Sequence, residues 1–401
     1  MALAVALAVL TCWARPALAQ GSAIFPLDHF WTHVLDAPFA APPAADARHI
    51  YVPMQTGSLV AIDPASNAPG WSAELAVDTA PIAADGRVYA AAAGAVHALD
   101  AATGAVAWRL PAGPLAAPLV YRAGWLIVTL ADGAIQAVRA ADGSVMWALS
   151  ADAPAAAAPA IDGNLLAVPL ADGRIIAIDL PSGKTHWARP LGAVASGITI
   201  SGDRVFAGTR DGSFWSLETD DGDIDWRWRV GARAIGAPAA DSNAVYAVAA
   251  DNVVRGFSRG SGNQRWSLAL TTRALAGPSL IDGVLVVTTG EVGRPGLTYI
   301  RTDTGTSGGR TPPLPDATET MRVQYPVLVS TGAAPRAFLA TATPGGHWAL
   351  HGYRQTFLAP GGIGAIAFGP RYEIRLRLDV ATGIRIFGIR VPLVPPVPGV
   401  P

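Results

Sequence analysis

The histidines are the residues of this chain that could most readily hold a metal ion or carry a proton. Their spacing suits neither role. His347 and His351 lie in a predicted β-strand, where a separation of four residues places two side chains about 13 Å apart, too far to chelate one ion. His97 and His186 each stand alone. The sequence therefore predicts no catalytic residue, no metal site and no enzyme activity.

Four aspartates recur at the same place in successive parts of the chain, at Asp132, Asp172, Asp211 and Asp251. Two roles fit them. They could form an acidic ring that binds a partner, or they could stabilise tight turns, because an aspartate side chain readily hydrogen-bonds nearby backbone. The turn interpretation is favoured, since each aspartate lies in a short loop.

Five residues are candidates for contact with a protein partner, because loops carry much of the binding function of proteins and Arg and Trp are enriched in binding surfaces. Arg210 and Asp211 precede a predicted turn glycine, while Glu291 and Arg294 belong to a longer loop. Trp215 follows Arg210 closely enough to add an aromatic contact if it faces the same side. The alternative is that Trp215 fills the core.

The elements that would position these residues repeat along the chain. Seven tryptophans follow one another at intervals of 37 to 40 residues: Trp31, Trp71, Trp108, Trp147, Trp187, Trp226 and Trp266. Most of them end a motif of the form A-x-D-x-x-T-G-x-x-x-W, which is clearest from Asp100 to Trp108. Later copies have Gly309 and Phe387 where the tryptophan would stand. Trp215 and Trp228 fall outside the repeat, which favours core packing for both.

Each repeat contains several short runs in which apolar residues alternate, such as residues 57–63 and 173–179. Asp-Gly and Gly-Asp pairs bound these runs, and the chain holds 43 glycines and 33 prolines, so the runs predict strands joined by tight hairpins. Each repeat then supplies four antiparallel strands, which is one propeller blade. The predicted fold is an all-β, eight-bladed propeller over residues 20–391. In it the Thr-Gly pair forms a turn and the tryptophan packs against the neighbouring blade.

The eighth blade lacks one strand. Residues 323–353 supply three strands of it, and two segments could supply the fourth. One is the N-terminal strand at residues 30–35, and the other is the segment at residues 372–391. Either of them would close the ring, and the sequence leaves this choice open.

The order of strands in a blade predicts a binding face. In a four-stranded antiparallel blade, the loops between second and third strands share one rim with the connections between blades. The Thr-Gly turns then lie on the opposite rim. Arg210, Asp211, Glu291 and Arg294 all fall on the first rim, where loop lengths vary most. We therefore expect a partner to dock there.

The motif and its period resemble the pyrroloquinoline-quinone-like repeat, strongly over residues 31–309 and weakly over residues 310–391. Within that superfamily the chain is most similar to the BamB family, scaffold proteins of the machinery that assembles β-barrels in the outer membrane. The resemblance implies a non-enzymatic, eight-bladed protein that binds the periplasmic domains of the central assembly protein. It also implies that no cofactor is bound. The tail at residues 371–401 is not expected in a protein of the BamB family.

Two other functions remain as alternatives. A quinoprotein dehydrogenase, or another quinone-binding propeller, shares the same repeat. Such an enzyme needs an acidic base and ligands for calcium on the ring axis, and many carry an adjacent pair of cysteines, whereas this chain has one cysteine. The third function is that of a propeller that binds some unrelated partner, because a fold does not determine its function.

The start of the chain favours export. An apolar stretch too short to span a bilayer leads to Ala17-Leu18-Ala19 before Gln20, which predicts a signal peptide at residues 1–19 and a periplasmic protein associated with the outer membrane. Cys12 follows Thr11 rather than Gly or Ala, which disfavours a lipid anchor there.

Charge and composition limit the partners. The net charge is −1 and basic residues do not cluster in the sequence, so a nucleic-acid partner is not expected. Hydrophobic residues make up 51% of the chain, enough for a large core. We expect a monomer that binds another protein, with a Pro-rich tail at residues 392–401.

Overall fold

The computed structural model describes residues 27–281, 283–330, 336–355, 363–367, 373–379 and 383–390. The predicted signal peptide, Cys12 and the Pro-rich tail lie outside these residues. None of the described residues forms a helix long and apolar enough to cross a membrane.

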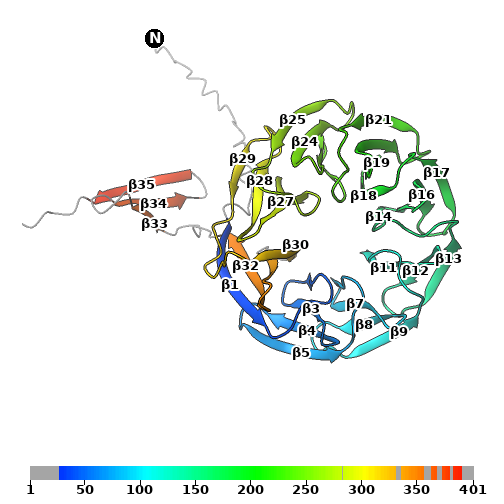
Figure 1. Cartoon of the computed structure of the whole chain (residues 1–401), viewed down its shortest axis with the longest axis horizontal. Helices are drawn as coiled ribbons and strands as arrows, with labels where there is room; N and C mark the ends of the chain where they lie inside the picture. Colours follow the sequence, from blue (N-terminus) through cyan, green and yellow to red (C-terminus); the bar gives the residue numbers. More distant parts are fainter. Residues whose placement is uncertain are drawn as a thin grey trace, which may run out of the picture. The chain divides into compact units, whose positions relative to one another are not determined.

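Eight four-stranded antiparallel sheets stand around a ring, so the predicted propeller is confirmed (Figure 1). We letter the strands of a blade A to D in the order in which they pair. Blade 1 contains β2 (Ala44–Ala45), β3 (Ile50–Met54), β4 (Ser58–Asp63) and β5 (Ala68–Glu74). Blade 2 contains β6 (Ile82–Ala84), β7 (Arg87–Ala92), β8 (Ala95–Asp100) and β9 (Val106–Pro111). Blade 3 contains β10 (Val120–Arg122), β11 (Trp125–Thr129), β12 (Ala134–Arg139) and β13 (Val145–Ser150).

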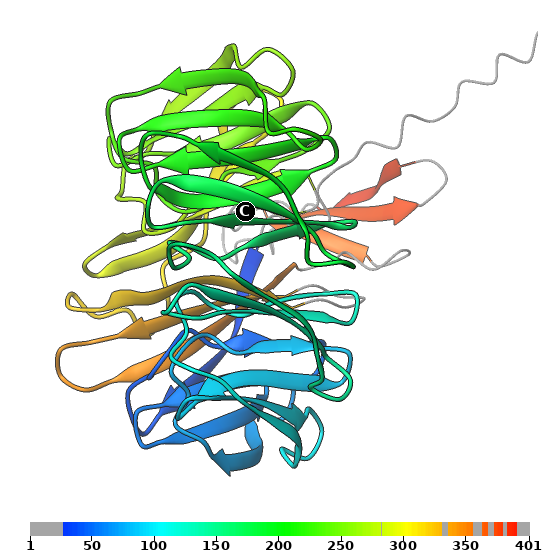
Figure 2. The same ribbon diagram turned by 90° about the vertical axis from the view of Figure 1, so that its right-hand side faces the viewer.

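The next four blades have the same strand order. Figure 2 shows the green and yellow blades among them from the side. Blade 4 contains β14 (Ala160–Asp162), β15 (Leu165–Pro169), β16 (Arg174–Asp179) and β17 (Thr185–Pro190). Blade 5 contains β18 (Ala195–Ser201), β19 (Arg204–Thr209), β20 (Ser213–Glu218) and β21 (Ile224–Arg229). Blade 6 contains β22 (Ala239–Ala240), β23 (Ala244–Val248), β24 (Val253–Ser258) and β25 (Gln264–Ala269). Blade 7 contains β26 (Ser279–Ile281), β27 (Val284–Glu291), β28 (Arg294–Arg301) and β29 (Ser307–Arg310).

The core lies between the blades, because each sheet packs a neighbour against both of its faces. The B and C strands are therefore buried at most positions, and all five residues of β3 are buried. The D strands lie at the outside, and β13 alternates exposed and half-buried residues after its first two positions. Between blades 3 and 4, for example, Ile127 and Ile135 pack in one cluster with Leu166 and Ile178. This explains why middle strands read as continuous apolar runs.

The repeated tryptophan connects each blade to the next. Its indole Nε1 donates a hydrogen bond to a backbone carbonyl in the following C–D turn, and its ring lies over the turn glycine of that blade. The pairs are Trp71 with Ala101, Trp108 with Ala140, Trp147 with Leu180, Trp187 with Thr219, Trp226 with Arg259 and Trp266 with Thr302, at 2.6 to 3.0 Å. The predicted packing of the tryptophan against the neighbouring blade is thus confirmed.

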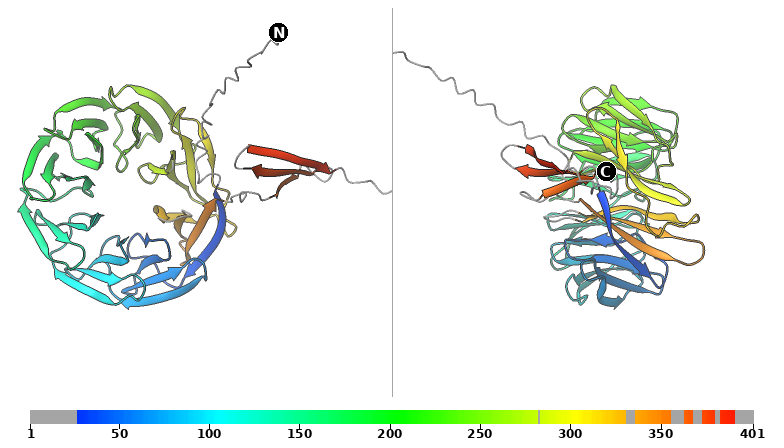
Figure 3. Two further views of the ribbon diagram at one scale, coloured as in Figure 1. Left: turned by 180° about the vertical axis from the view of Figure 1, so that it is seen from behind. Right: turned by 90° about the vertical axis from the view of Figure 1, so that its left-hand side faces the viewer.

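The N-terminal strand closes the ring. Blade 8 contains β30 (Arg322–Ser330), β31 (Arg336–Ala342), β32 (Trp348–Gln355) and, as its D strand, β1 (Leu27–Leu35). Figure 3 shows β1 in blue alongside the orange strands of this blade. Blade 8 has no C–D turn, because its C and D strands come from opposite ends of the chain. A tryptophan at position 309 would have no such turn to cover, which explains the glycine found there.

The contact from blade 8 to blade 1 differs from the other junctions. Trp31 is buried but its Nε1 has no hydrogen-bond partner among the described residues. Asn67 occupies the place of the turn glycine, with φ +57°, and its Oδ1 lies 2.7 Å from His33 Nδ1. Trp31 still packs against Ile50 and Ile62 of blade 1, and a histidine–asparagine hydrogen bond stands where the other junctions have the hydrogen bond of the indole.

The other closing segment belongs to a different sheet. Strands β33 (Ile363–Ala367), β34 (Glu373–Asp379) and β35 (Gly383–Arg390) form a three-stranded sheet in a second compact unit, residues 355–401. No described strand of this sheet pairs with a blade. The propeller was expected to run to residue 391, whereas its last strand ends at Gln355. The edge of β32 is taken by β1, so the ring needs no strand from this segment.

Candidate functional site

The connections of the propeller form two rims. The loop rim carries the linkers between blades and the B–C loops. The linkers are residues 36–43, 75–81, 112–119, 151–159, 191–194, 230–238, 270–278 and 311–321. The B–C loops are residues 55–57, 93–94, 130–133, 170–173, 210–212, 249–252, 292–293 and 343–347. The turn rim carries the A–B turns and the C–D turns. Backbone hydrogen bonds hold linkers against B–C loops, as from Arg210 N to Val194 O at 2.9 Å and from Ala250 N to Arg233 O at 2.9 Å.

Arg210 and Asp211 form the tip of the B–C loop of blade 5, but only Arg210 is exposed. The Asp211 carboxylate accepts hydrogen bonds from Thr209 Oγ1 at 2.6 Å and from Ser213 N at 3.1 Å, and it lies 3.6 Å from the Arg227 guanidinium. Burial alone would raise the pKa of Asp211, but these hydrogen bonds outweigh it and lower the pKa. Asp211 therefore stabilises the loop, and Arg210 is the residue of the pair that faces solvent.

This difference predicts unequal effects on stability. Asp211→Ala is expected to lower the free energy of unfolding by about 1–3 kcal/mol, because it leaves donors of the loop without their acceptor. Arg210→Ala should change it by less than about 0.5 kcal/mol, since the side chain is exposed. Urea unfolding of the two variants measures the difference. Equal losses would mean that the loop does not depend on the Asp211 carboxylate.

All four recurring aspartates make the same turn contact. Each Oδ1 accepts a hydrogen bond from the backbone N–H two residues later, at 2.9 to 3.1 Å, in the loops of Asp132, Asp172, Asp211 and Asp251. Arginines also lie close to three of them, as at Asp251, whose Oδ2 is 2.5 Å from Arg255 Nη2. The turn interpretation is confirmed, and these aspartates do not form an uncompensated acidic ring.

Trp215 does not reach the surface of the loop rim. It pairs with Ala207 in the middle of blade 5, is 5% exposed and belongs to the core between blades 4 and 5. The Arg227 guanidinium lies over its ring, 4.3 Å from the centroid. The alternative of core packing therefore holds for Trp215. Trp228 is 37% exposed, and its ring lies 5.9 Å from that of Phe257 in blade 6.

Glu291 and Arg294 face each other across the hairpin between β27 and β28, and both are exposed. The tip residue Val292 is exposed too, at 49%. Burial lowers the pKa of Arg310, and the carboxylate of Glu291 opposes this effect, which indicates that these two charges lie near each other. Glu291 thus has a cationic neighbour, while Arg294 makes no ion pair with any described residue.

Two further arginines on the loop rim were missed by the sequence reasoning. Arg233 and Arg273 occupy equivalent positions in successive linkers, 40 residues apart, and both are exposed. An alignment of the repeats could have found them, because the equivalent linker positions hold Pro114, Pro154 and Val194 instead of an arginine.

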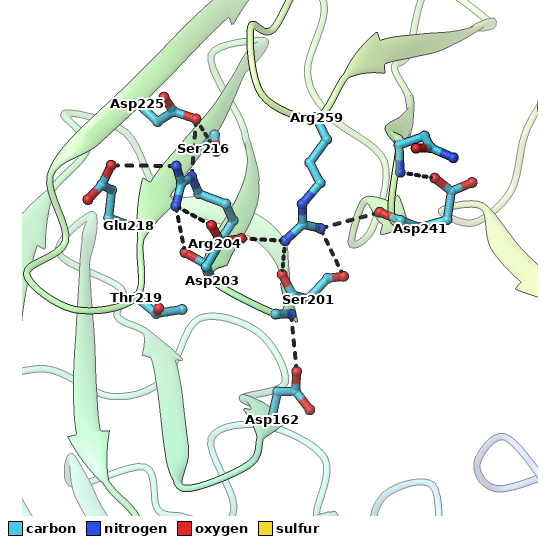
Figure 4. A network of polar contacts seen from close by, with 12 residues as sticks. Asp162, Ser201, Asp203, Arg204, Ser216, Glu218, Thr219, Asp225, Asp241 and Arg259 are labelled. Carbon is cyan, nitrogen blue, oxygen red and sulfur yellow. Dashed lines mark hydrogen bonds and ion pairs between the residues drawn. The ribbon is translucent and has the colours of Figure 1, made fainter.

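The turn rim contains a polar network that the sequence did not predict either (Figure 4). Arg259 of blade 6 donates to Asp203 Oδ1 at 2.8 Å and to Ser201 Oγ at 3.0 Å, both in blade 5. Asp162 of blade 4 accepts from Gly202 N at 3.2 Å. The contacts join three blades and occupy the polar groups involved. A hollow of about 300 Å³ lies beside them, lined in part by Asp162 and His186.

A metal-dependent quinone site requires several ligands in one place. Within the described residues, no group of three His, Cys, Asp or Glu side chains is close enough together to hold a metal ion. The donor set of the described residues does not fit calcium with a quinone.

Comparison with known proteins gives one family and several similar folds. A family model described as outer-membrane protein assembly factor BamB matches residues 28–113, 92–191 and 171–323. No curated protein sequence matches.

Many solved structures share the fold, and three of them serve as examples. BamB from Moraxella catarrhalis is 19% identical with a TM-score of 0.62, covering 82% of this chain and 98% of that one. The computationally designed protein Ika8 is 15% identical with a TM-score of 0.65, covering 82% and 98%. Quinohemoprotein alcohol dehydrogenase from Comamonas testosteroni is 12% identical with a TM-score of 0.64, covering 86% and 79%. At these identities the likeness concerns the fold alone.

Proposed function

Since the chain belongs to the BamB family of outer-membrane protein assembly factors, we propose that it is a non-catalytic scaffold in the periplasm. In this proposal it acts as a monomer and binds the periplasmic domains of the central β-barrel assembly protein through the loop rim. Its role is to assist the assembly of outer-membrane β-barrel proteins.

The contrast between the two rims supports docking on the loop rim. On the turn rim, Asp162, Asp203 and Arg259 already bond groups of neighbouring blades. On the loop rim, Arg210 and Arg294 are exposed and have no ion-pair partner among the described residues. Unpaired side chains on loops of a rigid scaffold are free to contact a partner.

The enzymatic alternative has less support. The likeness to an alcohol dehydrogenase at 12% identity concerns the fold, and one fold hosts many activities. An activity has to be argued from a site, and the described residues provide no cluster of metal ligands.

A steric block on each rim tests the proposal. The chain from Gln20 onward contains no cysteine, so Val292→Cys on the loop rim and Lys184→Cys on the turn rim can each be labelled with a bulky polyethylene glycol maleimide. Val292 and Lys184 are both exposed, so labelling should leave the fold intact. The assay measures capture of the purified periplasmic domains of the central assembly protein from the same organism.

We expect capture by the unlabelled protein and by the Lys184→Cys conjugate, and at least a tenfold loss of capture, about the effect of losing one interface anchor, for the Val292→Cys conjugate. The reverse pattern would assign docking to the turn rim. No capture by the unlabelled protein would contradict the proposed function itself.

A further inference from the structure

The loop rim of blades 5 to 7 departs from the rest of the repeat by its arginines. Other B–C loops place Ala131, Ala171 or Ala250 where blade 5 has Arg210. The linkers after blades 5 and 6 contain Arg233 and Arg273. The repeats serve as an internal comparison, because equivalent positions have the same backbone role. An arginine in place of alanine, proline or valine at such a position is not needed for the fold.

Backbone contacts show that these arginines lie along one continuous path. Ala234 N donates to Thr209 O at 3.0 Å, so Arg233 lies beside Arg210. The Asn252 side chain donates to Thr272 O at 3.1 Å and accepts from Ala274 N at 2.8 Å, which holds Arg273 against the B–C loop of blade 6.

The path continues to the hairpin of blade 7. Gly290 N donates to Arg273 O at 3.0 Å, and Arg294 starts the strand opposite Glu291. Leu275 lies against this hairpin, because a Cβ atom at Gly290 would come within 2.6 Å of Leu275 Cδ1. We call this surface the cationic crescent; it consists of Arg210, Arg233, Arg273, Leu275, Val292 and Arg294.

The arginines of the cationic crescent have exposed carboxylates in their neighbourhood, at Asp251, Glu291 and Glu319, but are not paired with them. Its four arginines are exposed, and none of them makes an ion pair or a side-chain hydrogen bond with a described residue. By contrast, Arg227 and Arg255 in the same blades lie next to Asp211 and Asp251. The crescent also exposes apolar surface, with Leu275 at 40% and Val292 at 49%.

The opposite sector of the same rim carries the other sign of charge. Glu74 at the end of β5, Asp78 in the linker after it and Asp132 in the B–C loop of blade 3 are exposed there. The arginines of this rim are thus gathered in blades 5 to 7, where Asp251, Glu291 and Glu319 are also exposed. Arginines gathered on one side of the ring favour an orientation of the partner that places its carboxylates over them.

We propose that the cationic crescent binds a protein segment in which carboxylate side chains alternate with apolar ones. This deepens the proposed function, on which it rests, by giving the chemistry of the partner surface. Arginine pairs well with carboxylates, and Leu275 and Val292 supply apolar contact between the charges. A protein segment fits better than an anionic membrane, because Asp211, Asp251 and Glu291 lie between the arginines and would repel a continuous layer of phosphates.

Charge reversal on matched positions tests the inference. The crescent variant combines Arg210→Glu, Arg233→Glu and Arg273→Glu. The control variant makes the same change of net charge on the opposite rim, with Arg48→Glu, Lys184→Glu and Arg265→Glu, all at exposed positions. The probes are a synthetic peptide of alternating Glu and Leu, the same peptide with Lys in place of Glu, and vesicles of phosphatidylglycerol. Binding is measured at low and high salt, and melting temperatures check that both variants remain folded.

We expect the Glu-Leu peptide to bind the wild-type protein and the control variant, and to bind the crescent variant at least about tenfold more weakly. Added salt should weaken the binding, and the Lys-Leu peptide should not bind. Equal binding of the Glu-Leu peptide to all three proteins would overturn the inference. So would crescent-dependent binding to the vesicles without binding to the peptide.

The experiments distinguish a failure of this inference from a failure of the proposed function. If the wild-type protein captures the assembly domains and the crescent variant captures them equally well, the inference is wrong and the proposed function stands. If the wild-type protein captures no assembly domain but binds the Glu-Leu peptide through the crescent, the proposed function is wrong and the inference stands.

Discussion

Acidification from pH 6.5 to pH 4 is expected to cost the protein about 3 kcal/mol of stability through a single buried histidine, His351. This side chain has no exposed surface, and burial lowers its pKa from 6.5 to about 4. Its Nε2 lies 2.8 Å from Thr341 Oγ1, and its Nδ1 lies 3.2 Å from Thr32 Oγ1 in the closing strand β1. The neutral ring thus connects strand β32 to the closing strand β1.

The direction of this pH dependence follows from comparing proton binding in the unfolded and the folded protein. Below pH 6.5 the unfolded chain binds a proton at this histidine, whereas the folded protein does so only near pH 4, so stability falls as the pH drops through this window. Asp316, 3.8 Å from the ring, favours the charged form of His351, while His29 and His347 oppose it. Burial remains the largest effect.

Urea unfolding between pH 7.5 and pH 4 measures this dependence. His351→Gln should flatten the pH profile by most of the expected loss, whatever its effect at neutral pH. Burial also lowers the pKa of His29 and His97, so a smaller slope should remain. His186→Gln, at an exposed position, is the control substitution. A His351→Gln profile as steep as that of the wild-type protein would show that this histidine does not cause the acid sensitivity.

Gly104→Ala is expected to lower the free energy of unfolding by about 2–4 kcal/mol, through backbone strain and through overlap with a tryptophan ring. Gly104 has φ +74°, which strains any residue with a Cβ atom. That atom would also lie 2.5 Å from Trp71 Cε3. The indole cannot easily move aside, because Trp71 Nε1 is hydrogen-bonded to Ala101 O at 3.0 Å.

Gly86→Ala is the matched control, in the A–B turn of the same blade. Its φ of +72° imposes similar strain, but an added Cβ atom would meet nothing within 4 Å. We therefore expect a loss of about 1 kcal/mol, the strain contribution alone. Urea unfolding compares the two variants. Similar losses for both would mean that the contact between tryptophan and glycine contributes little to the joining of blades.

The period of the repeat was enough to predict the blades. Each tryptophan covers the turn glycine of the next blade, so the same pair of residues has to recur once per blade, and the spacing of Trp71, Trp108 and Trp147 records this contact directly. The roles of Asp132 and Asp172 were also readable, because an aspartate that bonds the backbone two residues later needs only local geometry.

The direction in which a side chain points required the structure. Trp215 follows Arg210 by only five residues, yet it is buried under Arg227 while Arg210 is exposed. The strand register decides this, since one face of β20 packs against blade 4. The sequence equally gave no sign that Arg233 and Arg273 form no ion pair with any residue that the structure describes, because this depends on residues distant in sequence.

Ring closure shows which features the local sequence determined and which one required the tertiary structure. Local residues determined the blades, their turns and the rim on which each loop lies, because hairpins and the contacts of successive blades involve nearby parts of the chain. The closing strand joins β1 to β32, more than 300 residues apart, and both candidate segments carry the alternation of a strand. Only the tertiary structure decided between them. An alternating pattern shows that a segment can form a strand, but it does not show which sheet edge that strand pairs with.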